Sequence, residues 1–197
     1  MQQIILILPF ESNSCTFAKR PIMRISVYFL LFALLTSCTS QKEKAEVEIK
    51  ANLELVNQSF SDNKLDTAAA STVEQGIGNF LDKYPQDSMA SVYLFELGLL
   101  YQKQRKFEQA INAFDKVYRE YPDSKHARNA VFLEGFLYAN VLNNYDKARE
   151  KYQLYLDKFA AADEKMTSDV RLELQNLGKS PDELLKEILA KDSLDAL

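Results

Sequence analysis

The sequence contains few residues that carry metal, redox or disulfide chemistry. It has two cysteines, one histidine and no tryptophan, and both cysteines, Cys15 and Cys38, lie near the N-terminus. The rest of the chain therefore has no thiol that forms a disulfide. The single histidine, His126, has no cysteine or second histidine as a co-ligand, so we expect a solvated surface residue, no metal site and no cofactor.

Glycine and proline are also scarce, and the chain has no excess of positive charge. Five glycines and five prolines leave no glycine-rich phosphate loop, while helix-forming residues dominate after residue 40. We therefore predict an all-α protein that is not an enzyme and has no small-molecule substrate. Carboxylates such as Glu96 and Glu134 are expected on solvated helix faces, paired with basic neighbours. With 24 basic against 28 acidic residues, the net charge of -4 argues against nucleic acid as a partner.

The N-terminus lacks a hydrophobic run long enough to span a bilayer. Arg24 precedes an apolar run from Ile25 to Leu35, whose 11 residues fall well short of the roughly 20 that a transmembrane helix needs. A positive start, a short apolar run and small residues after it are typical of a secretory signal. We predict that residues 1–37 are a signal peptide, that translation starts at Met23, and that residues 1–22 lie upstream of the true start.

The end of this signal, Leu35-Thr36-Ser37-Cys38, resembles the bacterial lipobox. The resemblance implies that Cys38 is acylated, as by palmitate, and becomes the mature N-terminus, with residues 38–44 as a lipidated tether to the membrane. The alternative is an ordinary apolar cysteine at the end of a signal anchor. Thr39 after the cysteine implies, by analogy with enterobacterial sorting, an outer-membrane protein of the bacterial cell envelope that faces the periplasm.

Between residues 43 and 160 the apolar positions recur at helical spacing in six segments separated by short polar turns. The first runs from Ala45 to Phe60, and the second from Leu65 to Tyr84, before Pro85. Two more helix pairs follow, near residues 88–104 with 107–121 and 125–141 with 145–159.

The last two pairs are copies of each other at a period of 37 residues. Gly98 aligns with Gly135, as do the tyrosines three residues later, and the second helices match after one extra residue in the later turn. Pro85 precedes Pro122 by the same 37 residues, so a more divergent copy comes first. Internal repetition at this period is typical of a helical solenoid.

One series of residues resembles the tetratricopeptide pattern: Leu94, Leu97, Gly98, Tyr101, Ala110, Phe114 and Pro122. The resemblance implies a tetratricopeptide-like helical-hairpin solenoid of about three helix pairs over residues 45–160. Gly98 and Gly135 are expected where paired helices touch. The later copy departs from the pattern at Glu134, where leucine is usual, and at Ala160, where proline is usual.

The 37-residue period, the Tyr-Pro endings at Pro85 and Pro122, and the lipidated N-terminus together resemble BamD-type outer-membrane-assembly lipoproteins. Similar repeats occur in the periplasmic CpoB/YbgF proteins of the Tol-Pal system. The resemblance implies a non-catalytic protein-binding scaffold that assists outer-membrane protein assembly, with an outer-membrane β-barrel assembly protein as its partner. Two alternatives stay open: an envelope-maintenance factor linked to Tol-Pal or peptidoglycan, and a glycan-binding or hydrolytic lipoprotein, against which the absence of tryptophan argues.

Residues 161–197 are predicted to form two C-terminal capping helices. Apolar spacing continues from Met166 to Leu177, and Gly178 ends that helix. Ser180 and Glu183 predict a capping box for a last helix, whose apolar face is Leu184, Leu185, Ile188 and Leu189. We interpret both helices as a cap over the end of the solenoid. The alternative is a detachable partner-binding helix.

The resemblance also implies where a partner binds. In tetratricopeptide solenoids the first helix of each pair lines a concave face through repeat positions two, five, nine, twelve and thirteen. These fall on Val92, Phe95, Leu99, Gln102 and Lys103 in one copy, and on Asn129, Phe132, Phe136, Ala139 and Asn140 in the next. This predicted binding face suits an extended or helical peptide. The alternative is that neighbouring helices cover it and make Phe132 and Phe136 simple core residues.

Overall fold

The computed structural model describes residues 22–61 and 64–195, with side chains from residue 41 to residue 190 apart from residues 62, 63 and 188. The residues described form eight α-helices and no strand, which confirms the predicted all-α fold class. The chain divides into two units, Met1–Gln41 and Lys42–Leu197. The first unit contributes the N-terminal part of helix α1, and the second contains the repeats.

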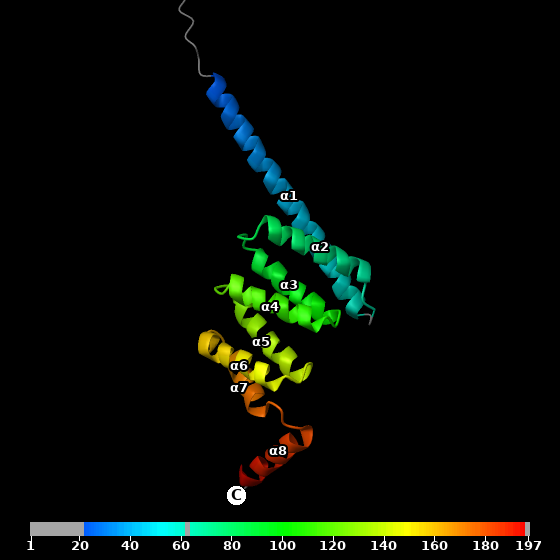
Figure 1. Cartoon of the computed structure of the whole chain (residues 1–197), viewed down its shortest axis with the longest axis vertical. Helices are drawn as coiled ribbons and strands as arrows, with labels where there is room; N and C mark the ends of the chain where they lie inside the picture. The colour runs from blue at the N-terminus through cyan, green and yellow to red at the C-terminus, as the bar shows by residue number, and fades with distance from the viewer. Residues whose placement is uncertain (1–21, 62–63, 196–197) are drawn as a thin grey trace, which may run out of the picture. The chain divides into compact units, whose positions relative to one another are not determined.

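The six helices expected before residue 160 are present. The first two are α1 (Ile22–Ser61) and α2 (Thr67–Lys83). The next pairs are α3 (Ala90–Lys103) with α4 (Phe107–Glu120), and α5 (Lys125–Asn140) with α6 (Tyr145–Phe159), followed by α7 (Glu164–Asn176) and α8 (Pro181–Asp195). In Figure 1, α2 to α7 stack one after another, each against its neighbour in the chain. This arrangement confirms the tetratricopeptide-like helical-hairpin solenoid.

Side-chain caps fix the starts of several helices. Asp66 accepts hydrogen bonds from the backbone N–H groups of Ala68 and Ala69 at the start of α2. Asn144 caps α6 and Asp163 caps α7 in the same way. Each side-chain oxygen satisfies N–H groups that have no carbonyl partner inside the helix. The polar residues of the turns therefore determine where these helices begin.

The predicted capping box opens α8. The Ser180 N–H donates to Glu183 Oε2 at 2.8 Å, and the Glu183 N–H donates to Ser180 Oγ at 3.3 Å. Gly178 follows the end of α7 with a φ of +82°, a left-handed conformation that glycine adopts without strain. Both local predictions for this turn are confirmed.

The copies repeat in backbone conformation as well as in sequence. Tyr84 and Tyr121, each just before a proline, have φ, ψ angles of -132°, 52° and -133°, 55°. Arg105 and Asn143, at equivalent positions in the turns inside two pairs, both have positive φ, 61° and 49°. Ala160, where the later copy lacks the proline, instead stays helical at φ -55°, ψ -31°.

Glycine sets the distance between the helices of a pair. A Cβ atom placed on Gly98 would lie 2.4 Å from the Phe114 ring, and one on Gly135 would lie 2.6 Å from the Tyr152 ring. Real side chains do not approach so closely, because protein interiors are already packed at crystal density. The predicted contact of paired helices at these two glycines is confirmed.

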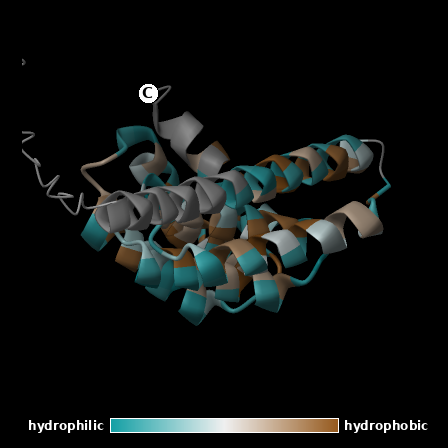
Figure 2. Cartoon of the chain, turned by 90° about the horizontal axis from the view of Figure 1, so that it is seen from above, coloured by the Kyte–Doolittle hydropathy of each residue, from teal (hydrophilic) through white to brown (hydrophobic). Residues whose placement is uncertain are grey.

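Three buried clusters form the core, one for each helix pair. The first contains Ile49 and Val56 of α1 with Phe80 of α2, the second is built around Phe114, and the third around Tyr152. Figure 2 shows the hydrophobic residues where helices face one another and hydrophilic residues on the outer surfaces. Burial of these apolar side chains stabilises the stack.

The lipidated tether over residues 38–44 stays a prediction, and the two C-terminal helices expected after residue 160 are present. Residues 38–44 belong to α1, and Lys42 pairs with Glu46 and with Asp87, which follows α2. α7 packs against α6 and buries Val170, so it caps the last pair. On α8, however, Leu185 and Leu189 are 55% and 59% exposed, so this part of its apolar face does not cover the solenoid.

Candidate functional site

In the earlier copy, the predicted binding face is partly closed by its neighbours. Phe95 is buried, with its ring centroid 5.5 Å from that of Phe114 and 5.1 Å from that of His126. Lys103 is held by Asn57 of α1 through a hydrogen bond. The other residues of the face on α3 are half-buried. Only part of this surface is open to a partner.

In the later copy the face is more open. Asn129, Phe132 and Phe136 are half-buried and Asn140 is exposed, whereas Ala139 is buried. The Phe132 ring centroid lies 6.4 Å from that of Phe136. Asn140 Nδ2 donates to the Phe136 carbonyl at 3.2 Å, which leaves the Asn140 side-chain oxygen as an acceptor. Phe132 and Phe136 are therefore neither fully solvated nor simple core, and their part in binding stays a prediction.

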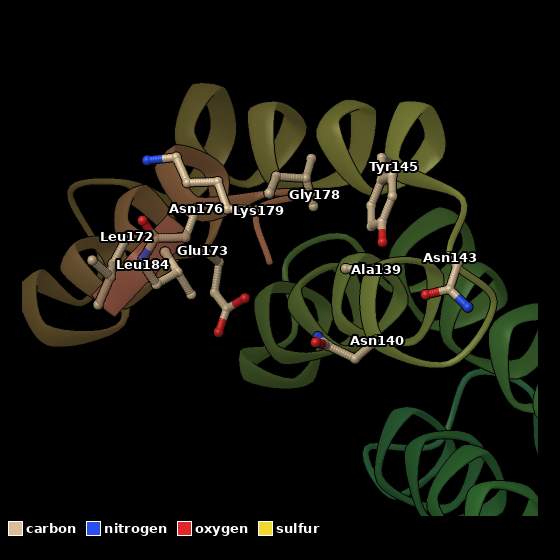
Figure 3. Close-up of a pocket in the computed structure, with 11 residues that line it drawn as sticks. Ala139, Asn140, Asn143, Tyr145, Leu172, Glu173, Asn176, Gly178, Lys179 and Leu184 are labelled. Carbon is tan, nitrogen blue, oxygen red and sulfur yellow. The ribbon is translucent and has the colours of Figure 1, made fainter. Parts of the chain in front are cut away.

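A pocket of about 350 Å³ continues this face towards the C-terminus. Ala139 and Asn140, the last two residues of the predicted face, line it from α5. Figure 3 shows them with Asn143 of the next turn and Tyr145 at the start of α6, opposite residues of α7 and beyond that include Leu172, Glu173, Asn176 and Leu184. The predicted face thus leads into a concave site that has convergent polar groups and apolar walls, as binding pockets do.

Sequence reasoning identified two of the pocket residues and missed the others. Asn143 belongs to a turn, Tyr145 is the first residue of α6, and Glu173 and Asn176 belong to a helix outside the repeats. The adjacent asparagines at 143 and 144 were the one available signal, because asparagine tolerates the left-handed backbone of a turn. No repeat position points to Glu173, since the pattern ends before α7.

Glu134 contradicts the expectation of a solvated carboxylate. Its side chain is fully buried, and Lys151 Nζ lies 2.6 Å from Glu134 Oε2 and 3.4 Å from Asp115 Oδ1. Burial raises the pKa of Glu134 to about 7, although the hydrogen bond and charge of Lys151 act in the opposite direction. Glu96 is half-buried, and burial raises its pKa as well. The predicted pairing of Glu134 with a basic residue is present, but it lies in the protein interior.

His126 is also not the solvated residue that the sequence predicted. It is half-buried beside Phe95, and both ring nitrogens are buried with no hydrogen-bond partner in the structure. Burial, followed by the nearby Lys125 charge, lowers the pKa of His126 and favours the neutral ring. In the described part of the chain, no group of three or more His, Cys, Asp or Glu side chains is placed to hold a metal ion.

These features are those of a tetratricopeptide-like helical repeat fold, which typically serves as a protein-binding scaffold rather than as an enzyme. The tetratricopeptide repeat family matches residues 93–124, which cover most of α3, all of α4 and the turn after it. No curated protein matches the chain. No helix among the residues described combines the length and apolar character that a bilayer-spanning segment needs.

Proposed function

We propose that this chain is a lipid-anchored protein-binding scaffold of the bacterial cell envelope, which assists the assembly of outer-membrane proteins as BamD-type lipoproteins do. The observation that carries the binding role is the continuity between the open face of α5 and the pocket beyond it. Phe132 and Phe136 offer half-buried aromatic surface, and Asn140 offers a free side-chain oxygen beside the pocket. Such a surface holds a peptide by a few anchors and by hydrogen bonds to its backbone.

The membrane anchor is supported by the sequence at Cys38. The lipobox-like residues end a signal that is too short to span a bilayer. Several acyl chains on one cysteine, each CH₂ contributing about 0.8 kcal/mol on burial, hold a protein on a membrane stably. Only three residues separate Cys38 from Lys42, which already pairs with Asp87 of the repeat region.

Lipidation is tested by replacing Cys38→Ala in the chain expressed from Met23. We expect loss of label from an alkyne fatty acid fed to the cells, because no other cysteine follows Met23. Thr39→Ala is the matched control and should label normally. Undiminished label in the Cys38→Ala protein would refute the anchor.

The partner is tested by photo-crosslinking in living cells with benzoylphenylalanine at position 136. A control protein carries it at position 119 on α4, where the native Arg119 side chain is 72% exposed. We expect a β-barrel assembly protein to be crosslinked from position 136 only. Recovery of Tol-Pal or peptidoglycan components instead would establish the envelope-maintenance alternative.

A further inference from the structure

We infer that the pocket between α5 and α7 binds a basic side chain, arginine or lysine, carried by an extended segment of a partner protein. The inference rests on the proposed protein-binding function and adds the chemistry of the ligand. The main observation behind this inference is Glu173, a half-buried carboxylate that lines the pocket and forms no ion pair with any residue described.

Burial and the neighbouring Glu173 carboxylate together raise the pKa of the Tyr152 hydroxyl, so Glu173 lies beside this buried tyrosine. No cation among the residues described neutralises Glu173, so its charge remains available to a ligand. Figure 3 shows its carboxylate extending from α7 into the gap that faces the end of α5. The one ammonium group that lines the pocket, Lys179, is already paired, with its Nζ 2.7 Å from Glu187 Oε2, and it points away from Glu173 in Figure 3. A carboxylate accepts several hydrogen bonds, so Glu173 has the capacity to bind a donor-rich cation.

Other groups around the pocket are also suited to a cationic side chain. The Tyr145 ring is 41% exposed and packs over Gly178, where an added Cβ would lie 3.5 Å from the ring. An aromatic face of this kind attracts a guanidinium or ammonium group. Leu172, which is 57% exposed, offers apolar contact for the aliphatic stem of the ligand side chain.

Asparagine amides at the rim suit the backbone of an extended segment. Asn140, Asn143 and Asn176 all line the pocket. Asn140 uses its Nδ2 for the Phe136 carbonyl, which leaves its side-chain oxygen to accept a backbone N–H. Each free amide group can both donate and accept, which matches the alternating groups of an extended chain. The pocket thus recognises a basic side chain and the peptide units that flank it.

The test uses peptides of the sequence fluorescein-Gly-Leu-Arg-Leu-Gly-amide, with the dye on the N-terminal amine and citrulline in place of arginine as the neutral isostere, and the full chain in detergent micelles. Fluorescence anisotropy is measured at low salt. We expect the arginine peptide to bind about tenfold more tightly than the citrulline peptide, because hydrogen bonds to charged groups are stronger than neutral ones. The preference should weaken as salt is added.

Glu173→Gln should abolish this preference while leaving the helical circular dichroism unchanged. Asp169→Asn removes one charge from an exposed position of the same helix, outside the pocket, and should keep the preference. Equal binding of the arginine and citrulline peptides, no binding of either, or a preference that survives Glu173→Gln would each overturn the inference. If position 136 still crosslinks a protein in cells, the binding function stands without this specificity. If the peptides behave as expected but no partner is crosslinked, the binding function proposed for cells fails instead.

Discussion

Two joints in this solenoid occupy equivalent places but are built from different chemistry. The joint of α2, α3 and α4 places Gly78, Leu97 and Ala113 at positions that Asp115, Glu134 and Lys151 take in the joint of α4, α5 and α6. At the first, a Cβ on Gly78 would meet nothing within 4 Å, and a hollow of about 210 Å³ lies beside Leu97 and Ala113. At the second, Lys151 connects Glu134 to Asp115.

The comparison shows which part of the repeat is constrained. Inside each pair, a glycine meets an aromatic ring in both copies, Gly98 with Phe114 and Gly135 with Tyr152. Between pairs, the same backbone accepts either apolar contact or a buried ion pair. Buried ion pairs rarely add stability over apolar packing, because desolvation of the charges offsets their attraction. We expect the ionic joint to fix how the last pair stacks rather than to strengthen it.

Removal of Lys151 should produce the largest effect. Lys151→Ala leaves the buried Glu134 without its cation and is expected to destabilise the protein by about 3 to 5 kcal/mol at neutral pH. Lys116→Ala on exposed α4 surface is the control and should change stability by less than about 0.5 kcal/mol. Urea unfolding followed by circular dichroism measures both. Equal stability of the two variants would show that the buried Glu134 carboxylate does not need Lys151 as its counterion.

The glycine contacts should give the next largest effect. Gly98→Leu forces α3 away from Phe114 and should cost about 1 to 3 kcal/mol through overpacking. Gly78→Ala, in a helix with open space beside it, should instead stabilise the protein by about 0.5 to 1 kcal/mol, because alanine loses less backbone entropy than glycine. Thermal unfolding of both variants gives the comparison, and an unchanged melting temperature for Gly98→Leu would show that the assigned register is wrong.

The ionic joint should also make stability depend on pH. Because burial raises the pKa of Glu134 in the folded protein to about 7 from its ordinary value of 4.5, the folded protein binds more protons than the unfolded chain between these values. The contribution of Glu134 to stability is therefore greatest below pH 4.5 and is lost as the pH rises through 7, by on the order of 1 to 3 kcal/mol.

The control for this pH effect is Glu134→Gln. His126 has a lowered pKa and acts in the opposite direction, adding stability as the pH rises through its unfolded value. The difference between wild type and Glu134→Gln at each pH isolates the carboxylate, because His126 is present in both. A constant difference from pH 4 to pH 8 would contradict the predicted titration.

Conversion of the second joint into the first should have the smallest net effect. The double variant Glu134→Leu with Lys151→Ala introduces two of the three residues of the first joint and keeps the half-buried Asp115. Because it removes the buried carboxylate together with its cation, it should recover most of the stability lost in Lys151→Ala. Its stability should fall within about 1 kcal/mol of wild type or exceed it. A double-mutant cycle by urea unfolding gives the coupling between the two side chains. A double variant as unstable as Lys151→Ala would show that the two joints are not interchangeable.

Local sequence patterns were sufficient for most of the helical framework. The polar turn residues, the prolines after Tyr84 and Tyr121, and Gly178 predicted where helices begin and end. The 37-residue period predicted the contacts at Gly98 and Gly135. Helix boundaries and repeat register depend on residues that are close in sequence, and such interactions are visible without the fold.

The candidate site was only partly visible in the sequence. Asn140 and Ala139 were placed on the predicted face, but Glu173 comes from a helix that lies outside the repeat pattern. The leucines of α8 show the same limit: an apolar face at helical spacing predicts that a helix is amphipathic, not that its apolar side is covered. Leu185 and Leu189 remain exposed.

The sequence by itself determined the helices, their pairing and the glycine contacts inside each pair, because these follow from spacing along the chain. Only the tertiary structure decided that Glu134 is buried and that Glu173 lines a pocket. Burial depends on which distant segments cover a side chain: Lys151 lies 17 residues after Glu134, and Asp115 lies 19 residues before it. The sequence shows which residues are glutamates. Their solvent exposure and neighbouring groups, which set the pKa and the role of each carboxylate, arise only when the chain folds.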